Sequence, residues 1–138
     1  MDIDSLTVET DLFNHRDVKP HFINPCCFGE DFAAWLREEI RELASEGYEL
    51  SEPIQEDYGW GFWATRGRDH LWIAISFCGE GPTEDPGEWV VSVAADPGLN
   101  PLKRLLHKPD AAALARVRSR VWQALRSEPR IREIPDGR

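Results

Sequence analysis

The chain has 138 residues, of which 41% are hydrophobic and 10% aromatic, and its 25 acidic and 16 basic side chains give a formal charge of −9. This apolar content excludes intrinsic disorder, and a chain of this length buries roughly 68% of its unfolded surface, enough for one core. No apolar run approaches the roughly 18 residues of a membrane span, and no secretory signal is recognised, so we expect a single domain over residues 1–138 in the cytoplasm, away from membranes.

The charge is unevenly distributed along the chain. Residues 1–60 hold 15 acidic and 4 basic side chains, whereas residues 101–138 hold 4 and 10. Because nucleic-acid affinity rests on neutralising phosphates, a chain that is acidic overall is not expected to bind nucleic acid. Its charge suits a basic protein partner, although net charge can also serve only to keep a protein soluble.

The N-terminal part is predicted to contain one strand and one helix. Alternating apolar side chains indicate a strand over residues 5–13, and the proline-bearing segment 19–28 is expected to be an irregular connection. A helix is predicted over residues 30–46, because acids occupy its first turn and Gly47 follows it. Its apolar stripe consists of Phe32, Trp35, Leu36, Ile40 and Leu43. Residues 51–59 are expected to form an acidic turn.

The remainder is predicted to contain three successive strands and a long helix. The strands are expected over residues 60–66, 70–77 and 88–95. A short helix is expected over residues 100–107, and a long one over 110–127 with Asp110 as its cap. Residues 130–134 are expected to add a short edge strand or none.

This order of elements predicts an α+β fold. Short connections make the middle of the sheet antiparallel, and the two long helices must bury their apolar stripes against it. We therefore expect a two-layer sandwich, with a mainly antiparallel sheet and two long helices on one face.

One charged side chain falls within the apolar stripe of each long helix. These are Glu39 on the first helix and Arg118 on the second. A lone buried charge is costly, so we predict that Glu39 and Arg118 form a structural ion pair. The alternative is that both stripes are narrower and the long side chains reach solvent.

The segment from Pro53 to Trp63 is the most unusual stretch of the sequence. It combines two adjacent carboxylates with four aromatic side chains and two glycines. As a partner-binding platform it would use acids to attract a basic protein and aromatic rings as anchors. Two other interpretations remain: Glu56 and Asp57 could act as general acid and base, or the aromatic rings could belong to the core while the acids solvate a turn.

The sheet face away from the helices is a second candidate interface. If Leu71, Ile73, Ile75 and Phe77 face the helices, Trp72 faces away from them, with Trp63 beside it. Such an apolar patch would suit an interface, including one between two copies of the chain. Alternatively, the connection over residues 14–28 covers this face. The protein is expected to be a monomer or a homodimer.

Known catalytic and metal-binding motifs are absent from the sequence. No two histidines have the spacing of a metal-binding helix, and no nucleophile elbow or phosphate-binding loop occurs. The three cysteines, Cys26, Cys27 and Cys78, include no Cys-x-x-Cys pair and are expected to be free thiols. We assign no catalytic residue, metal ligand or cofactor.

Three features together resemble small uncharacterised bacterial single-domain proteins. They are the run from Phe22 to Gly29, the helix with Trp35 and Leu36, and the stretch from Glu52 to Trp60, which contains a Pro-x-x-Glu-Asp-aromatic-Gly-Trp motif. By size and charge alone, the chain also resembles immunity proteins, which neutralise toxins by covering a basic active site. Neither resemblance supplies catalytic residues.

The sequence therefore favours a non-enzymatic protein-binding domain, such as an inhibitor or immunity protein for a basic partner. The alternatives are a small hydrolase or transferase using Glu56 and Asp57, and a structural homodimer. The predicted partner-binding residues are Glu52, Glu56, Asp57, Tyr58, Trp60, Trp63 and Trp72.

Overall fold

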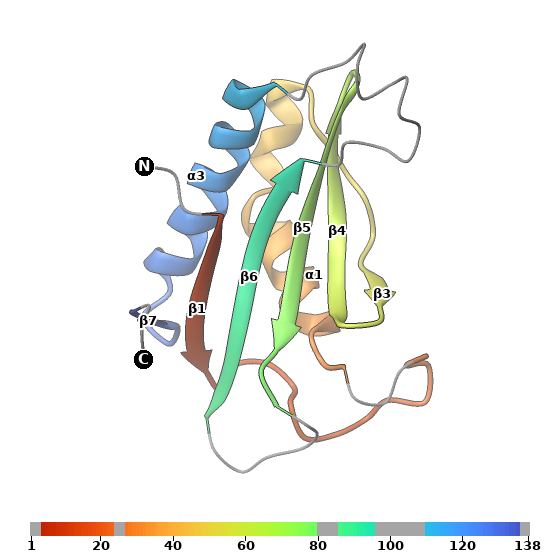
Figure 1. Cartoon of the computed structure of the whole chain (residues 1–138), viewed down its shortest axis with the longest axis vertical. Coiled ribbons are helices and arrows are strands. Elements are labelled where there is room, and N and C mark those ends of the chain that lie inside the picture. Colours follow the sequence, from red (N-terminus) through yellow and green to blue (C-terminus); the bar gives the residue numbers. More distant parts are fainter. Residues whose placement is uncertain (1–3, 24–26, 80–85, 96–109, 136–138) are drawn as a thin grey trace.

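The computed structural model describes residues 4–23, 27–79, 86–95 and 110–135 (Figure 1). Within these ranges seven strands form one antiparallel sheet: β1 Ser5–Thr10, β2 Glu49–Leu50, β3 Ile54–Glu56, β4 Gly59–Arg66, β5 Asp69–Phe77, β6 Gly87–Ala95 and β7 Arg132–Ile134. The spatial order is β2-β4-β5-β6-β1-β7, and β3 pairs with the first part of β4 while β2 pairs with its last part. The predicted α+β fold with a mainly antiparallel sheet is confirmed.

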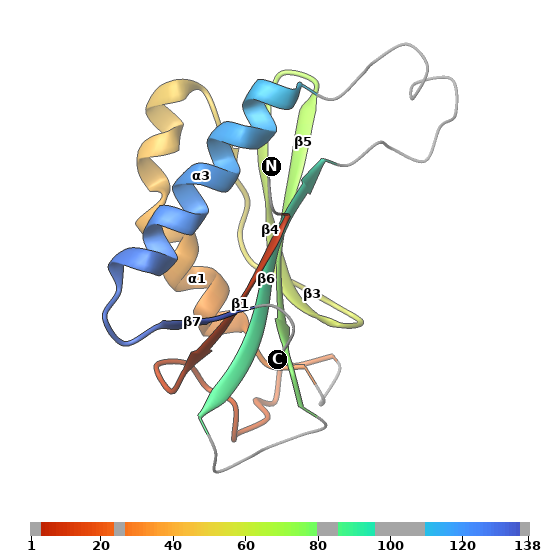
Figure 2. The same ribbon diagram turned by 60° about the vertical axis from the view of Figure 1, so that its left-hand side comes forward.

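The helical elements are α1 (Glu30–Glu39), a 3-10 helix η1 (Arg41–Glu46) and α3 (Ala111–Ser127). Figure 2 shows α1 and α3 on the same side of the sheet. The predicted helix over residues 110–127 is confirmed with its cap, since the Asp110 carboxylate accepts hydrogen bonds from the backbone of Ala112 and Ala113. The short helix predicted over residues 100–107 lies outside the described residues.

The prediction of one long helix over residues 30–46 is wrong. The α-helical hydrogen bonds end at Ile40, and Leu43 N–H then donates to the carbonyl of Ile40 rather than that of Glu39. In the tighter winding of η1, Leu43 remains fully buried after the α-helix has ended. The Glu39 carbonyl, left without its helical partner, accepts a hydrogen bond from Arg120 of α3 at 2.6 Å.

The expected ion pair between Glu39 and Arg118 is not formed. Arg118 donates through Nε to the carbonyl oxygen of Val93 in β6 at 2.9 Å, and the Glu39 side chain is exposed. A backbone carbonyl therefore satisfies the charged group in the α3 stripe, at lower desolvation cost than burying a carboxylate beside it.

The expected acidic turn over residues 51–59 is a turn only at Asp57 and Tyr58, and β3 occupies Ile54–Glu56. β2 and β3 both add to the outer side of β4, and Ser51 between them bonds to Trp63 through its N–H, which donates to the carbonyl at 2.9 Å. Arg37 of α1 donates to the carbonyls of Leu50 and Ser51. The Arg37 guanidinium supplies hydrogen-bond donors where the edge of the sheet is interrupted between β2 and β3. It helps to hold these two short strands against β4, although the sequence has no long alternating run there.

The core lies between the sheet and the helices. Its largest fully buried side chains are Trp89, Tyr48, Phe28, Phe32, Phe62, Leu36, Ile40, Leu43, Leu71, Ile73, Ile75 and Leu125. β7 pairs with β1, so the C-terminal edge strand is present. No helix in the described part of the chain has the length and apolar character needed to cross a bilayer.

Charged pairs connect η1 to α3. Arg116 binds the carboxylate of Glu46 through two hydrogen bonds of 2.8 and 2.6 Å, and Arg120 binds Glu42. The Arg116 hydrogen bond, opposed by a smaller desolvation effect, holds the pKa of Glu46 below its ordinary value.

Replacing Arg116 with Gln is therefore expected to raise the pKa of Glu46 toward its ordinary value, as measured by NMR titration of the side-chain carboxyl carbon. Since the pKa is lowered in the folded state, the pair stabilises above roughly pH 4.3, the unfolded value, and this contribution is lost as pH falls through the folded value. The stability difference between wild type and variant should therefore vanish in acid. An unchanged Glu46 pKa in the variant would contradict this assignment.

Candidate functional site

One face of the sheet points away from α1 and α3 and is called the open face here. On β3, β4 and β5 it carries Ile54, Glu56, Trp63 and Trp72, with Tyr58 in the turn between β3 and β4. In Figure 2, β3 and this turn bend away from the helices. Tyr58 is 46% and Ile54 39% exposed, while Trp63 and Trp72 are half-buried. The predicted orientation of Trp63 and Trp72 is thus present in the structure.

The aromatic side chains of the open face contact one another. The Trp63 and Trp72 rings lie 4.7 Å apart between centroids at 53°, and Trp72 Nε1 donates a hydrogen bond to the Tyr58 hydroxyl. Gly61 leaves room for this arrangement, because a Cβ atom there would lie 2.4 Å from the Trp72 ring. Burial raises the pKa of Tyr58 and the nearby Glu56 charge adds to this, whereas the Trp72 hydrogen bond opposes it. The rings form a rigid surface cluster.

Trp60, one of the predicted anchors, belongs to the core. Its side chain is 5% exposed on the helix-facing side of β4, and its Nε1 donates to the Cys27 carbonyl at 2.9 Å. Trp89 and Trp122 are also buried. The structure therefore leaves Trp63 and Trp72, and not Trp60, available to a partner.

The predicted acidic residues do not form one group. Glu52 is 84% exposed, but its carboxylate lies 3.5 Å from Arg37 of α1, on the side of the sheet edge where the helices pack. Glu56 shares the open face with Tyr58, and Asp57 is exposed in the turn. Glu56 and Asp57 therefore remain beside the aromatic cluster, whereas Glu52 is separated from it.

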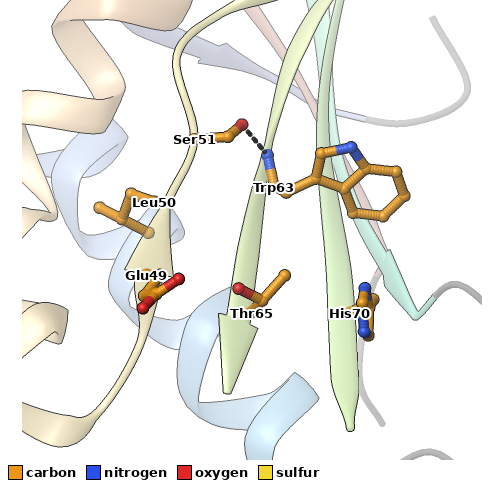
Figure 3. Close-up of a pocket in the computed structure, with 6 residues that line it drawn as sticks. All are labelled: Glu49, Leu50, Ser51, Trp63, Thr65 and His70. Carbon is orange, nitrogen blue, oxygen red and sulfur yellow. Dashed lines mark hydrogen bonds between the residues drawn. The ribbon is translucent and has the colours of Figure 1, made fainter. Parts of the chain in front are cut away.

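A hollow of about 300 Å³ lies on the open face next to Trp63 (Figure 3). It is lined by Glu49, Leu50, Ser51, Trp63, Thr65 and His70. Figure 3 shows Glu49, Thr65 and His70 side by side on three adjacent strands. Neither Glu49 nor His70 is among the residues predicted for this face. β2 is only two residues long and gives no alternating pattern, so no signal in the sequence indicated Glu49.

A second hollow, of about 620 Å³, lies along α1 and η1 and is lined by Glu38, Glu39, Arg41, Glu42 and Ser45. Neither of these two hollows is lined by Glu56 or Asp57. A cleft containing these carboxylates and a histidine was the feature expected for the alternative hydrolase or transferase.

The described part of the connection over residues 14–28 packs on the core side of the sheet. His15 contacts Phe77 and Trp89, and Phe22 contacts Trp60 at 5.3 Å between ring centroids. These partners all face the helices. In the described residues the connection therefore does not cover Trp63 and Trp72, contrary to the expected alternative.

The cysteines do not form a common site in the described residues. Cys78 is free, and the residue as a whole is exposed. Partial desolvation of its thiol and, to a smaller extent, the charge of Glu88 raise the pKa of Cys78. Cys27 is disulfide-bonded, so the expectation of a free thiol is wrong there, while Cys26 lies outside the described residues. Over the described ranges, no three His, Cys, Asp or Glu side chains are grouped to hold a metal ion.

No protein-family model, curated protein or solved structure matches the chain. The resemblance to small bacterial proteins and to immunity proteins therefore stays a prediction.

Proposed function

We propose that this chain is a non-enzymatic protein-binding domain whose open face docks a basic protein partner. The proposal treats the fold as two layers, in which both helices cover one sheet face and the other is free for binding. The observation that carries it is the contact between Tyr58, Trp63 and Trp72, which holds three partly exposed rings in fixed positions beside acidic side chains. Rigid aromatic side chains are the preferred anchors of protein interfaces.

Charge favours a basic partner over a second copy of this chain. Glu49 and Glu56 lie on the same face as the rings, Asp57 lies beside them, and the whole chain carries a charge of −9. Two copies meeting through this face would bring like charges together, whereas a basic protein would gain from long-range attraction. An inhibitor of the immunity-protein kind would have a partner of this chemistry.

The decisive test compares two pairs of adjacent acids on opposite sides of the sheet. A protein captured from the native host is identified and purified, and its association rate is measured against wild type and variants. The double substitution Glu56→Lys with Asp57→Lys is expected to slow association about tenfold at low salt and to flatten its salt dependence.

The matched control reverses the charges of Glu38 and Glu39 on α1, which changes the net charge by the same amount. At about 0.1 M ionic strength, where screening acts over about 10 Å, the control should associate at nearly the wild-type rate. If both double substitutions slow association equally, the effect comes from net charge alone. If Glu56→Lys with Asp57→Lys does not slow association, the open face is not the docking site.

A further inference from the structure

The hollow beside Trp63 contains three polar side chains from three adjacent strands. Glu49 pairs with Thr65 across β2 and β4, and Thr65 pairs with His70 across β4 and β5, so their side chains form one row on the open face. Among the described residues, none of the three side chains makes a hydrogen bond or an ion pair. Directly opposed side chains on adjacent strands have Cβ atoms about 5 Å apart, so the row spans roughly 10 Å.

The rest of the hollow consists of a fixed aromatic wall and a fixed edge. Trp63 is held by Trp72 on one side and meets the His70 ring edge-on at 6.4 Å between centroids. On the other side, Ser51 Oγ accepts the backbone N–H of Trp63 at 2.8 Å, which ties the β2 side of the hollow to β4 (Figure 3). The hollow therefore has its shape before a ligand arrives.

The size of the hollow limits what it can take. Its volume of about 300 Å³ is at the lower limit of small-molecule pockets, which run from roughly 300 to 1,000 Å³. One long side chain fits this space better than a large ligand. The Glu49 carboxylate selects a positive group, and the Trp63 ring favours one that can lie against an aromatic surface.

We propose that this hollow receives the guanidinium group of one arginine side chain from the basic partner. This inference rests on the docking role proposed above and identifies one contact within it. A guanidinium is planar, carries donors in a fixed fork that match a carboxylate, and stacks on aromatic rings. The Glu49 carboxylate accepts that fork, the Thr65 hydroxyl accepts a further N–H, and the ring lies against Trp63. A lysine ammonium carries the same charge but is not planar, so it cannot stack on the ring in this way.

The test uses Nα-acetyl-arginine amide as the probe, with the corresponding lysine and citrulline amides as controls. Binding is followed by NMR at the Trp63 indole N–H, whose resonance is assigned from its loss in Trp63→Phe. The arginine probe should shift this resonance with saturation, the lysine probe should bind several-fold more weakly, and the citrulline probe, which keeps the shape and lacks the charge, should not bind.

Two substitutions divide the contribution of the carboxylate from that of the ring. Glu49→Gln should weaken the arginine probe about tenfold, the size of one hydrogen bond to a charged group. Trp63→Leu lacks the indole reporter, so its binding is followed at the backbone N–H of Thr65, and it should weaken the probe about threefold. Glu38→Gln removes the same charge from α1 and should change nothing. Equal binding of arginine and citrulline, or no effect of Glu49→Gln, overturns the proposal.

The remaining outcomes separate this inference from the docking role. If the arginine probe fails to bind while Glu56→Lys with Asp57→Lys still slows the partner, the face docks a protein and the hollow is not its arginine pocket. If Glu49→Gln weakens both the probe and the purified partner, the pocket and the docking role stand together. A Trp63 shift that depends on protein concentration without any probe overturns the proposal in favour of a second copy.

Discussion

Replacing Trp89 with Ala is expected to lower the free energy of unfolding by about 3–5 kcal/mol, as measured by urea denaturation. Trp89 of β6 is fully buried, and its ring contacts those of Phe32 at 5.3 Å and Phe77 at 5.0 Å between centroids. Phe13 stacks on Phe32 at 4.1 Å, so removal of the indole opens a cavity in the middle of an aromatic group. Because small domains have only about 5–15 kcal/mol of stability in total, this single change threatens folding.

The control for this prediction is Trp72→Ala on the open face, which should cost only about 1 kcal/mol because the indole is already partly in solvent. Trp89→Phe retains most of the buried ring and removes an Nε1 donor that has no hydrogen-bond partner in the described structure, so it should cost far less than Trp89→Ala. Similar losses from Trp72→Ala and Trp89→Ala would mean that Trp72 is as enclosed as Trp89, and the open face would lose its anchors.

The strands of the central sheet follow from local alternation in the sequence. The predicted strands over residues 60–66, 70–77 and 88–95 agree with β4, β5 and β6 to within one residue at each end. In each strand one set of alternate residues is apolar and faces the helices, and a register shift by one residue would expose that whole set. The pattern therefore fixes both the strands and the direction of Trp63 and Trp72.

The errors arise where long-range contacts decide the structure. The helix predicted over residues 30–46 has a continuous apolar stripe, yet its winding changes at Ile40, where Arg120 of α3 binds the freed Glu39 carbonyl. β2 and β3 are too short to give a pattern, and they are held by β4 and by Arg37. Arg118 uses a strand carbonyl instead of the predicted acid, because any backbone acceptor within reach competes with a side-chain partner.

The candidate site was predictable in its rings and less so in its charges. Trp63 and Trp72 meet on the open face, as their strand positions suggest, and Tyr58 joins them from the turn between β3 and β4. Trp60 is separated from them by the pleat of β4, since adjacent residues of a strand point to opposite faces. Glu49 lies at the site because β2 pairs with β4, and no local pattern in the sequence predicts that pairing.

Replacing Gly61 with Ala is expected to displace the Trp72 ring and to destabilise the protein by about 1–3 kcal/mol. A Cβ at this position would lie 2.4 Å from Trp72 Cζ2 and 2.5 Å from the carbonyl oxygen of Ile73. The first contact can be relieved by rotating the indole away, which breaks its hydrogen bond to Tyr58. The second involves the backbone and can be relieved only by bending β4 against β5.

A double-mutant cycle separates these two effects. In a Trp72→Ala background Gly61→Ala should cost less than in wild type, because only the contact with the Ile73 carbonyl remains, and the coupling should fall within about 0.5–3 kcal/mol. In Gly61→Ala alone, the Trp72 indole N–H resonance should move toward its solvent-exposed position. Purely additive costs with an unmoved resonance would show that the ring does not lie over Gly61. The open face would then lack the fixed arrangement of Tyr58, Trp63 and Trp72 on which the proposed docking of a basic partner depends.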